Sequence, residues 1–215
     1  AFKNCINLKT IEFLTDDEML NTNQCSSDML KEIKDEAFYN CCSLTSILLP
    51  FSVVNIGERV FMNCSKLKHI EFGIKIINTD KKPMIYYRSF KSLNLISIGN
   101  SAFKNCTSLE SFSIPSSCYR IGLSAFMNCT SLRSFEYRGF DLQKIKYRTF
   151  YNCTSLTYFK INSSNANTFS LDFESFMNCS SLKEIIIDVK FPKKYDFSQS
   201  RKPKIHKRAF CNCTS

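Results

Sequence analysis

The chain has 215 residues, of which 44% are hydrophobic and 20 are phenylalanine, so it can build a continuous core without a metal or a cofactor. No stretch reaches the roughly 18 consecutive apolar residues that a membrane-spanning helix needs, and we expect no membrane insertion in this segment. The chain has 29 basic and 19 acidic residues, which gives a formal net charge of +10. A positive charge of this size is compatible with binding to anionic partners.

One short unit recurs along the whole chain. Its anchor is a phenylalanine that is followed two residues later by asparagine and three residues later by cysteine, at Phe2, Phe38, Phe61, Phe103, Phe126, Phe150, Phe176 and Phe210. Three residues beyond each cysteine but the last comes a leucine: Leu8, Leu44, Leu67, Leu109, Leu132, Leu156 and Leu182. Apolar residues follow that leucine at offsets of three and five in all seven copies. A unit this short cannot bury its own apolar face, so the pattern predicts a stack of units.

The spacing between anchors sets the period and locates insertions. Phe38 and Phe61 are 23 residues apart, as are Phe103 and Phe126, and this period lies in the leucine-rich-repeat range. Longer gaps predict insertions in a single domain over residues 1–215, near 14–28, 73–91, 162–168 and 188–203. The sequence does not decide whether residues 73–103 contain an extra degenerate repeat. Such a repeat is suggested because Ile85 and Phe90 have the same spacing of five as Ile98 and Phe103.

Each unit is expected to contain two extended segments and a turn. The run Leu-x-x-Ile-x-Ile predicts a strand whose last two apolar residues point inward, and stacked copies form a parallel sheet. Pro50 and Pro115 follow such strands directly and end them. A second apolar position precedes each anchor by five residues. Gly57 follows it in one unit but Lys146 does so in another, so a left-handed glycine is not expected there. The segment Ala-Phe-x-Asn-Cys is too short for a full helix and predicts a single turn with Phe and Cys buried.

These columns resemble the BspA-like leucine-rich repeats, written roughly Ile-Gly-x-x-Ala-Phe-x-x-Cys-x-x-Leu-x-x-Ile-x-Ile-Pro, over practically all 215 residues. The resemblance implies a mostly β member of the α/β repeat solenoids: a right-handed stack with a parallel sheet on the concave face and short turns or helical turns on the convex side. It also implies a place on surface proteins of bacteria or mucosal protists, and adhesion to host or matrix proteins. Because the chain begins and ends inside a unit, we expect a fragment that is uncapped at both ends.

The cysteines fall mainly into one column. Neighbouring turns lie about 4.8 Å apart with parallel side chains, which does not suit a disulfide, so the column predicts a ladder of buried free thiols. Its members are Cys5, Cys41, Cys64, Cys106, Cys129, Cys153, Cys179 and Cys213. The sequence lacks the Cys-x-x-Cys pairs that zinc sites in proteins use, so a zinc site is not expected. Cys25, Cys42 and Cys211 lie off the column, and Cys118 is expected in the core.

The asparagine column creates several Asn-x-Ser/Thr sequences that match the glycosylation acceptor pattern. We expect these amides instead to satisfy backbone groups of the turns, which leaves little room for a glycan. Asn162 lies outside the column and is the better acceptor in a secreted eukaryotic protein.

No arrangement of residues indicates catalysis. The two histidines, His69 and His206, have no Ser/His/Asp or Cys/His partners that the repeat would bring together, and His69 is expected to face solvent. We therefore expect no enzyme and no cofactor, with a hydrolase that uses an off-column cysteine as a remote alternative.

Binding is the function that stacked strands favour, because each strand contributes outward side chains to one ordered surface. Glu12, Glu71, Glu136 and Glu184 make the expected surface partly acidic, and apolar residues on it could anchor a partner. The predicted binding residues are Thr10, Glu12, Ser46, Leu48, His69, Glu71, Ser111, Ser113, Ser134, Glu136, Tyr158, Lys160, Glu184 and Ile186.

A second hypothesis rests on the last insertion, where residues 188–208 carry eight basic and two acidic residues. Such a loop could bind sulfated glycans or nucleic acid, or act only as a solubilising segment. Its basic residues include Lys190, Lys193, Lys194, Arg201, Lys202 and Lys204. We therefore predict a monomeric protein-binding module of a cell-surface or secreted adhesin, with a basic polyanion-binding scaffold as the alternative.

Overall fold

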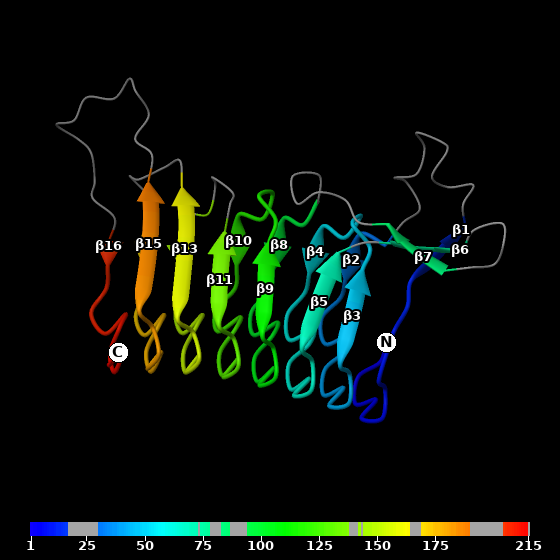
Figure 1. The fold of residues 1–215 in the computed structure, drawn as a ribbon, viewed down its shortest axis with the longest axis horizontal. Coiled ribbons are helices and arrows are strands. Elements are labelled where there is room, and N and C mark those ends of the chain that lie inside the picture. The colour runs from blue at the N-terminus through cyan, green and yellow to red at the C-terminus, as the bar shows by residue number, and fades with distance from the viewer. Residues whose placement is uncertain are drawn as a thin grey trace, which may run out of the picture.

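The computed structural model describes residues 1–16, 30–72, 74–77, 83–86, 94–137, 142, 144–163, 169–189 and 204–214. Within these residues the chain forms sixteen strands and no helix, and it winds into a solenoid of parallel strands (Figure 1). This part of the chain accordingly has no helix of the length and hydrophobicity that a membrane span requires.

Six longer strands stand side by side and form what we call the long-strand face (Figure 1). They are parallel and pair within two groups, β3 with β5 and β9-β11-β13-β15. Successive side chains of these strands alternate between outside and core, as in β9, where Ser111 and Ser113 are exposed and Phe112 and Ile114 are buried. The strands are β3 (Ser46–Leu49), β5 (His69–Phe72), β9 (Ser111–Ile114), β11 (Ser134–Tyr137), β13 (Tyr158–Ser163) and β15 (Glu184–Val189).

Seven two-residue strands form the opposite wall, the short-strand face. They pair in parallel in the orders β10-β8-β4-β2 and β12-β14-β16. Each ends in the apolar residue that precedes the anchor phenylalanine by five positions, such as Ile98 and Ile121. The strands are β2 (Glu32–Ile33), β4 (Asn55–Ile56), β8 (Ser97–Ile98), β10 (Arg120–Ile121), β12 (Lys144–Ile145), β14 (Ser170–Leu171) and β16 (Lys204–Ile205).

The core between the two walls is a set of columns along the solenoid axis. The rings of all eight anchor phenylalanines stack in sequence, with centroids 5.2–5.5 Å apart. Phe112, Phe135 and Phe159 of the long strands pack against these rings, and the Phe135 and Phe159 rings do so edge to face. Burial of one such side chain contributes about 1.5–3 kcal/mol, so a continuous column stabilises many neighbouring turns together.

Of the short turns or helical turns expected on the convex side, the described residues show turns at the anchors and no helix. The asparagine two residues after the anchor has a positive φ in all eight units, for example 66° at Asn63. The residue two before the anchor also has a positive φ, as at Arg59 (52°) and Ser124 (53°). Left-handed residues on both sides of the anchor interrupt a right-handed helix, so the chain instead makes compact turns. Backbone bonds join these turns along the stack, as from Phe103 N–H to the Ala125 carbonyl.

The asparagine side chains form a ladder. Asn105 Nδ2 donates to Asn63 Oδ1 at 2.8 Å, and Asn128 Nδ2 donates to Asn105 Oδ1 at the same distance. The amides thus bond mainly to one another and not to turn backbone groups as expected, because asparagine is needed first for its tolerance of the left-handed region. The side chain of Asn162 lies outside the described residues.

The cysteine column is confirmed as a ladder of free thiols. From Cys41 onward, each Sγ donates to the carbonyl oxygen of the anchor phenylalanine in the preceding unit, at 3.0–3.2 Å. Cys118, off the column, is fully buried as predicted, whereas Cys25 lies outside the described residues.

The second insertion leaves the stack instead of adding a unit to it. Strand β4 pairs directly with β8, and Phe61 stacks directly on Phe103, so no repeat lies between them. The insertion instead holds an antiparallel hairpin of β6 (Ile74–Ile77) and β7 (Pro83–Tyr86), and β1 (Leu14–Asp16) pairs in parallel with β6. Residues 164–168 and 190–203, in the third and fourth insertions, lie outside the described residues.

Candidate binding surface

The fourteen predicted binding residues occupy the outer side of the long-strand face and the equivalent positions of the first unit. None is buried: nine are exposed, and Leu48, Glu136, Tyr158, Lys160 and Ile186 are half-buried. They alternate with core residues because successive side chains of a strand point to opposite sides. The strand pairs of β9 through β15, and of β3 with β5, are in register, which places these side chains in two columns.

One column contains Ser46 opposite His69 and ends with Tyr158 opposite Glu184. The other contains Leu48 opposite Glu71, Glu136 opposite Lys160, and Lys160 opposite Ile186. Cross-strand neighbours of this kind have Cβ atoms about 4.5–5.5 Å apart, so their side chains can act together on one partner. The face is chemically mixed, with carboxylates, hydroxyls and a few apolar side chains.

The basic residues predicted in the last insertion are only partly described. Lys190, Lys193, Lys194, Arg201 and Lys202 lie outside the described residues. Lys204 begins β16 and is exposed. The structure therefore places one of the six on the short-strand face.

The buried thiols are poorly suited to nucleophilic chemistry. Burial raises the pKa of the Cys64 thiol to about 12 and also raises the pKa of Cys118 to about 12. For Cys106, Cys129 and Cys153 the same cause raises the pKa well above its ordinary value. A thiol that stays protonated at neutral pH is a weak nucleophile and a weak metal ligand. The column is a structural feature.

The two histidines are far apart in the stack. His69 is exposed at the start of β5, as predicted. His206 follows β16, where its ring packs against Phe173 and its Nε2 lies 3.8 Å from Asp172 Oδ1. His69 is the register partner of Ser46 on β3, but among the described residues neither histidine side chain hydrogen-bonds to a cysteine or serine side chain.

The repeating columns decide the family. The model of the BspA type leucine rich repeat region matches in six copies over residues 1–97 and 96–215. The chain belongs to the BspA-type leucine-rich repeat family. Members of this leucine-rich repeat family are generally protein-interaction modules. No curated protein sequence matches the chain.

Solved leucine-rich repeat proteins show similarity to this BspA-type chain. A leucine rich repeat protein of T. pallidum is 28% identical with a TM-score of 0.48, over 71% of this chain and 72% of that one. A Bacteroides ovatus protein is 23% identical with a TM-score of 0.46, over 99% and 72%. A leucine rich cell surface protein of Faecalibacterium prausnitzii is 18% identical with a TM-score of 0.41, over 89% and 62%. The chain thus spans 62–72% of these three proteins.

The short-strand face of this BspA-type solenoid holds polar residues that the sequence alone did not indicate as a site. A groove of about 490 Å³ lies on it, with Glu32, Asp35 and Glu58 toward one end and Arg120 and Lys146 toward the other. The sequence does show polar residues at the positions that flank the Gly57, Gly99 and Gly122 column. Only the stacking of the turns shows that these residues enclose a groove.

Proposed function

We propose that the chain is a non-enzymatic, monomeric protein-binding module of a cell-surface or secreted adhesin, and that it engages host or matrix proteins through the long-strand face. The observation that carries this proposal is the pair of outward columns held in register on parallel strands. The family's general role in protein interaction supports it. A rigid sheet needs little ordering when it binds, so its contacts can contribute fully to affinity.

Within this face, Tyr158 and Ile186 are the apolar anchors that we propose for the partner. Both are half-buried, on the neighbouring strands β13 and β15, and diagonal to each other across the pair. Aromatic and aliphatic side chains near the centre of an interface often dominate its binding energy. Glu71 and Glu136 would add selectivity for a basic rim on the partner.

Capture from extracellular-matrix and host-surface extracts tests the proposal. We expect the chain to retain a protein partner, and the double variant Tyr158→Ala/Ile186→Ala to weaken that binding about tenfold or more. Glu71→Lys/Glu136→Lys should reduce the association rate more than it changes dissociation. Lys193→Ala/Lys194→Ala is the matched control and should bind normally. Failure to capture any protein, or equal loss in the control, would contradict the proposal.

A second candidate function is binding of polyanions such as sulfated glycans or nucleic acid. Charge on the short-strand face supports it. The segments 120–124, 144–148, 170–174 and 204–208 carry seven basic against two acidic residues, whereas 32–36, 55–59 and 97–101 carry two against four. The basic half adjoins the last insertion in sequence.

Retention on heparin separates the two candidates. A polyanion site would hold the chain at low salt and lose it steeply by moderate salt, because bound counterions are released. Lys193→Ala/Lys194→Ala/Arg201→Ala/Lys202→Ala should then abolish retention, while the Tyr158→Ala/Ile186→Ala variant keeps it. No retention at low salt would rule this candidate out.

A further inference from the structure

The groove on the short-strand face is a trough with a defined floor and walls. Its floor is the column of Gly57, Gly99 and Gly122, which three consecutive turns contribute. One wall follows the starts of the short strands, and the other follows the positions directly after the column that holds Lys34, Gly57 and Gly99. The first wall consists of Glu32, Asn55, Ser97 and Arg120, and the second contains Asp35, Glu58 and Asn100.

The trough exists because glycine occupies this column only in the middle of the solenoid. Gly57, Gly99 and Gly122 have φ outside the left-handed region, as expected for this column, so their role is not conformational. A Cβ on Gly99 would instead lie 2.4 Å from the carbonyl carbon of Gly57, and one on Gly122 would lie 2.4 Å from the Asn100 backbone nitrogen. Gly99 and Gly122 thus have no room for a side chain of their own, and a Cβ on Gly57 would lie 2.5 Å from Asp35 Oδ1. Lys146 occupies the same column one turn beyond Gly122.

Charge changes sign along the trough. Glu32 and Asp35 lie by β2, Glu58 lies one turn further, and Arg120 and Lys146 lie by β10 and β12. Strands β2 and β10 are three steps apart in the sheet, or about 14 Å at ~4.8 Å a step. Between the charged ends lie neutral polar groups, where Ser97 Oγ donates to Asn55 Oδ1 at 2.7 Å.

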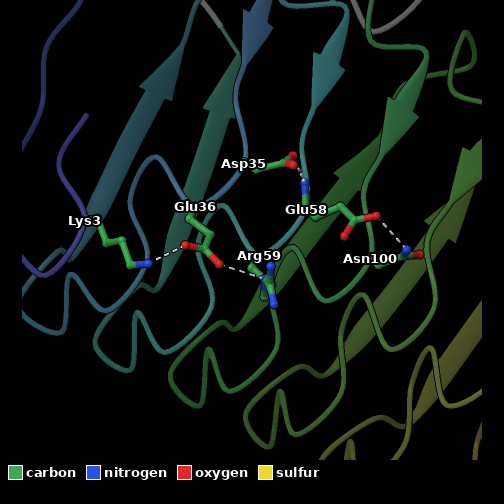
Figure 2. A network of polar contacts seen from close by, with 6 residues as sticks. All are labelled: Lys3, Asp35, Glu36, Glu58, Arg59 and Asn100. Atoms are coloured by element: carbon green, nitrogen blue, oxygen red, sulfur yellow. Dashed lines mark hydrogen bonds and ion pairs between the residues drawn. The ribbon is translucent and has the colours of Figure 1, made fainter.

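The second wall is held in place by a ladder that crosses the turns (Figure 2). Asp35 Oδ1 accepts from the Glu58 backbone N–H at 2.7 Å, and Asn100 Nδ2 donates to Glu58 Oε1 at 2.8 Å. Asn100 Oδ1 in turn accepts from the Leu123 backbone N–H at 2.9 Å. These bonds fix the carboxylates without neutralising them.

Glu36, which lies beside the trough, differs from the charged residues that line it. Glu36, also in Figure 2, forms ion pairs with Lys3 and Arg59, and the Lys3 hydrogen bond is the main cause that lowers the pKa of Glu36. Among the described residues, Glu32, Asp35 and Glu58 form no ion pair, and neither do Arg120 and Lys146. The trough therefore offers unneutralised charge of both signs to a ligand.

We propose that this trough binds an extended peptide segment that carries a basic side chain at one position and an acidic side chain four residues away. In an extended chain, positions four apart point to the same side and lie about 13 Å apart, which matches the separation of the charged ends. The basic side chain pairs with the Glu32/Asp35/Glu58 end, and the acidic one pairs with Arg120 and Lys146. A polyanion fits poorly, because the carboxylate end repels it. This site is separate from the long-strand face and does not depend on it.

Titration of the ¹⁵N-labelled chain with capped pentapeptides, followed by NMR, tests the proposal. The probes have lysine first and glutamate fifth, or the reverse order, with serine and glycine between. We expect at least one order to give saturable shifts at Gly57, Gly99 and Gly122. A pentapeptide with glutamine at both charged positions should bind more weakly, and salt should weaken the charged one.

Variants at the two ends decide the mode of binding. Glu32→Gln and Arg120→Gln should each weaken the charged peptide about two- to fivefold, the range of exposed ion pairs, and Glu184→Gln on the other face should have no effect. Thermal unfolding checks that all three variants stay folded. Absence of saturable shifts at millimolar peptide, or equal binding of the neutral peptide, would overturn the proposal. Heparin that displaces the peptide through Arg120 alone, with Glu32→Gln silent, would assign the trough to polyanions instead.

Discussion

Inside the solenoid, Phe103, Phe126 and Phe150 occupy equivalent positions and stack ring on ring, whereas outside it the equivalent positions Glu136 and Lys160 carry opposite charges. An interior side chain is surrounded by copies of itself in the turns before and after, so a change in one turn disturbs two others. An outward side chain meets solvent and a few neighbours. The contrast teaches that repetition marks the positions that the stack constrains, and that variation marks the positions that are free to acquire a binding role.

The strongest way to test this contrast is to remove one ring from the middle of the column. Phe126→Ala should lower the free energy of unfolding by about 3–5 kcal/mol, because it leaves a cavity among Phe103, Phe135 and Phe150. Urea denaturation followed by circular dichroism measures the change. Tyr158→Ala, on the outside, should cost no more than about 1 kcal/mol. Similar losses in both variants would contradict the distinction between inside and outside.

The glycine column gives a second test, because it lies at the surface and yet is constrained. Gly99→Ala should destabilise the chain by about 1–3 kcal/mol, since its Cβ would collide with the Gly57 carbonyl group. At an unconstrained site the same change would stabilise by about 0.4–1 kcal/mol, so the sign of the effect is diagnostic. Lys146→Ala in the same column is the control, and thermal unfolding of both variants provides the measurement.

Substitutions in the asparagine ladder can separate the contribution of the left-handed backbone conformation to stability from that of the side-chain hydrogen bond. Asn128→Ala should cost about 1–2 kcal/mol, because alanine resists the left-handed conformation and the bond to Asn105 is lost. Asn128→Gly loses the same bond but accepts the positive φ, so we expect a smaller loss. If glycine were as harmful as alanine in chemical denaturation, the hydrogen bond and not the backbone would be the main constraint.

Ionisation of the cysteine thiols has the smallest expected effect of these tests on the free energy of unfolding at neutral pH. Its effect grows as the pH rises. Because burial raises the pKa of Cys106 and Cys129 well above 9.0, these thiols stay protonated in the folded chain while those of the unfolded chain ionise. Stability is therefore intact below pH 9 and falls as the pH rises above it. Cys106→Ala/Cys129→Ala should show a shallower fall between pH 8 and 11 than the parent chain in denaturation curves. An unchanged slope would show that these thiols do not contribute.

Much of the fold follows from the sequence because the core columns are local in pattern and identical in chemistry. The anchor rings, the thiol ladder and the outward positions such as Ser113 and Glu136 were all predictable from offsets within one unit. The left-handed turn residues were not, since Arg59 and Ser124 carry no preference for that conformation. The β1–β6 pairing was also hidden, because it joins segments about 60 residues apart. The trough depends on how adjacent turns align, which a single unit cannot show.

The direct junction of β4 with β8 has a practical consequence for engineering. The insertion near 73–91 leaves and rejoins the stack there without separating two neighbouring turns, so it forms a side branch of the solenoid. Lengthening a closed branch costs only about 0.6 kcal/mol for each doubling. Such a junction is a natural position at which to graft a foreign epitope or a second domain while the parent scaffold keeps its shape.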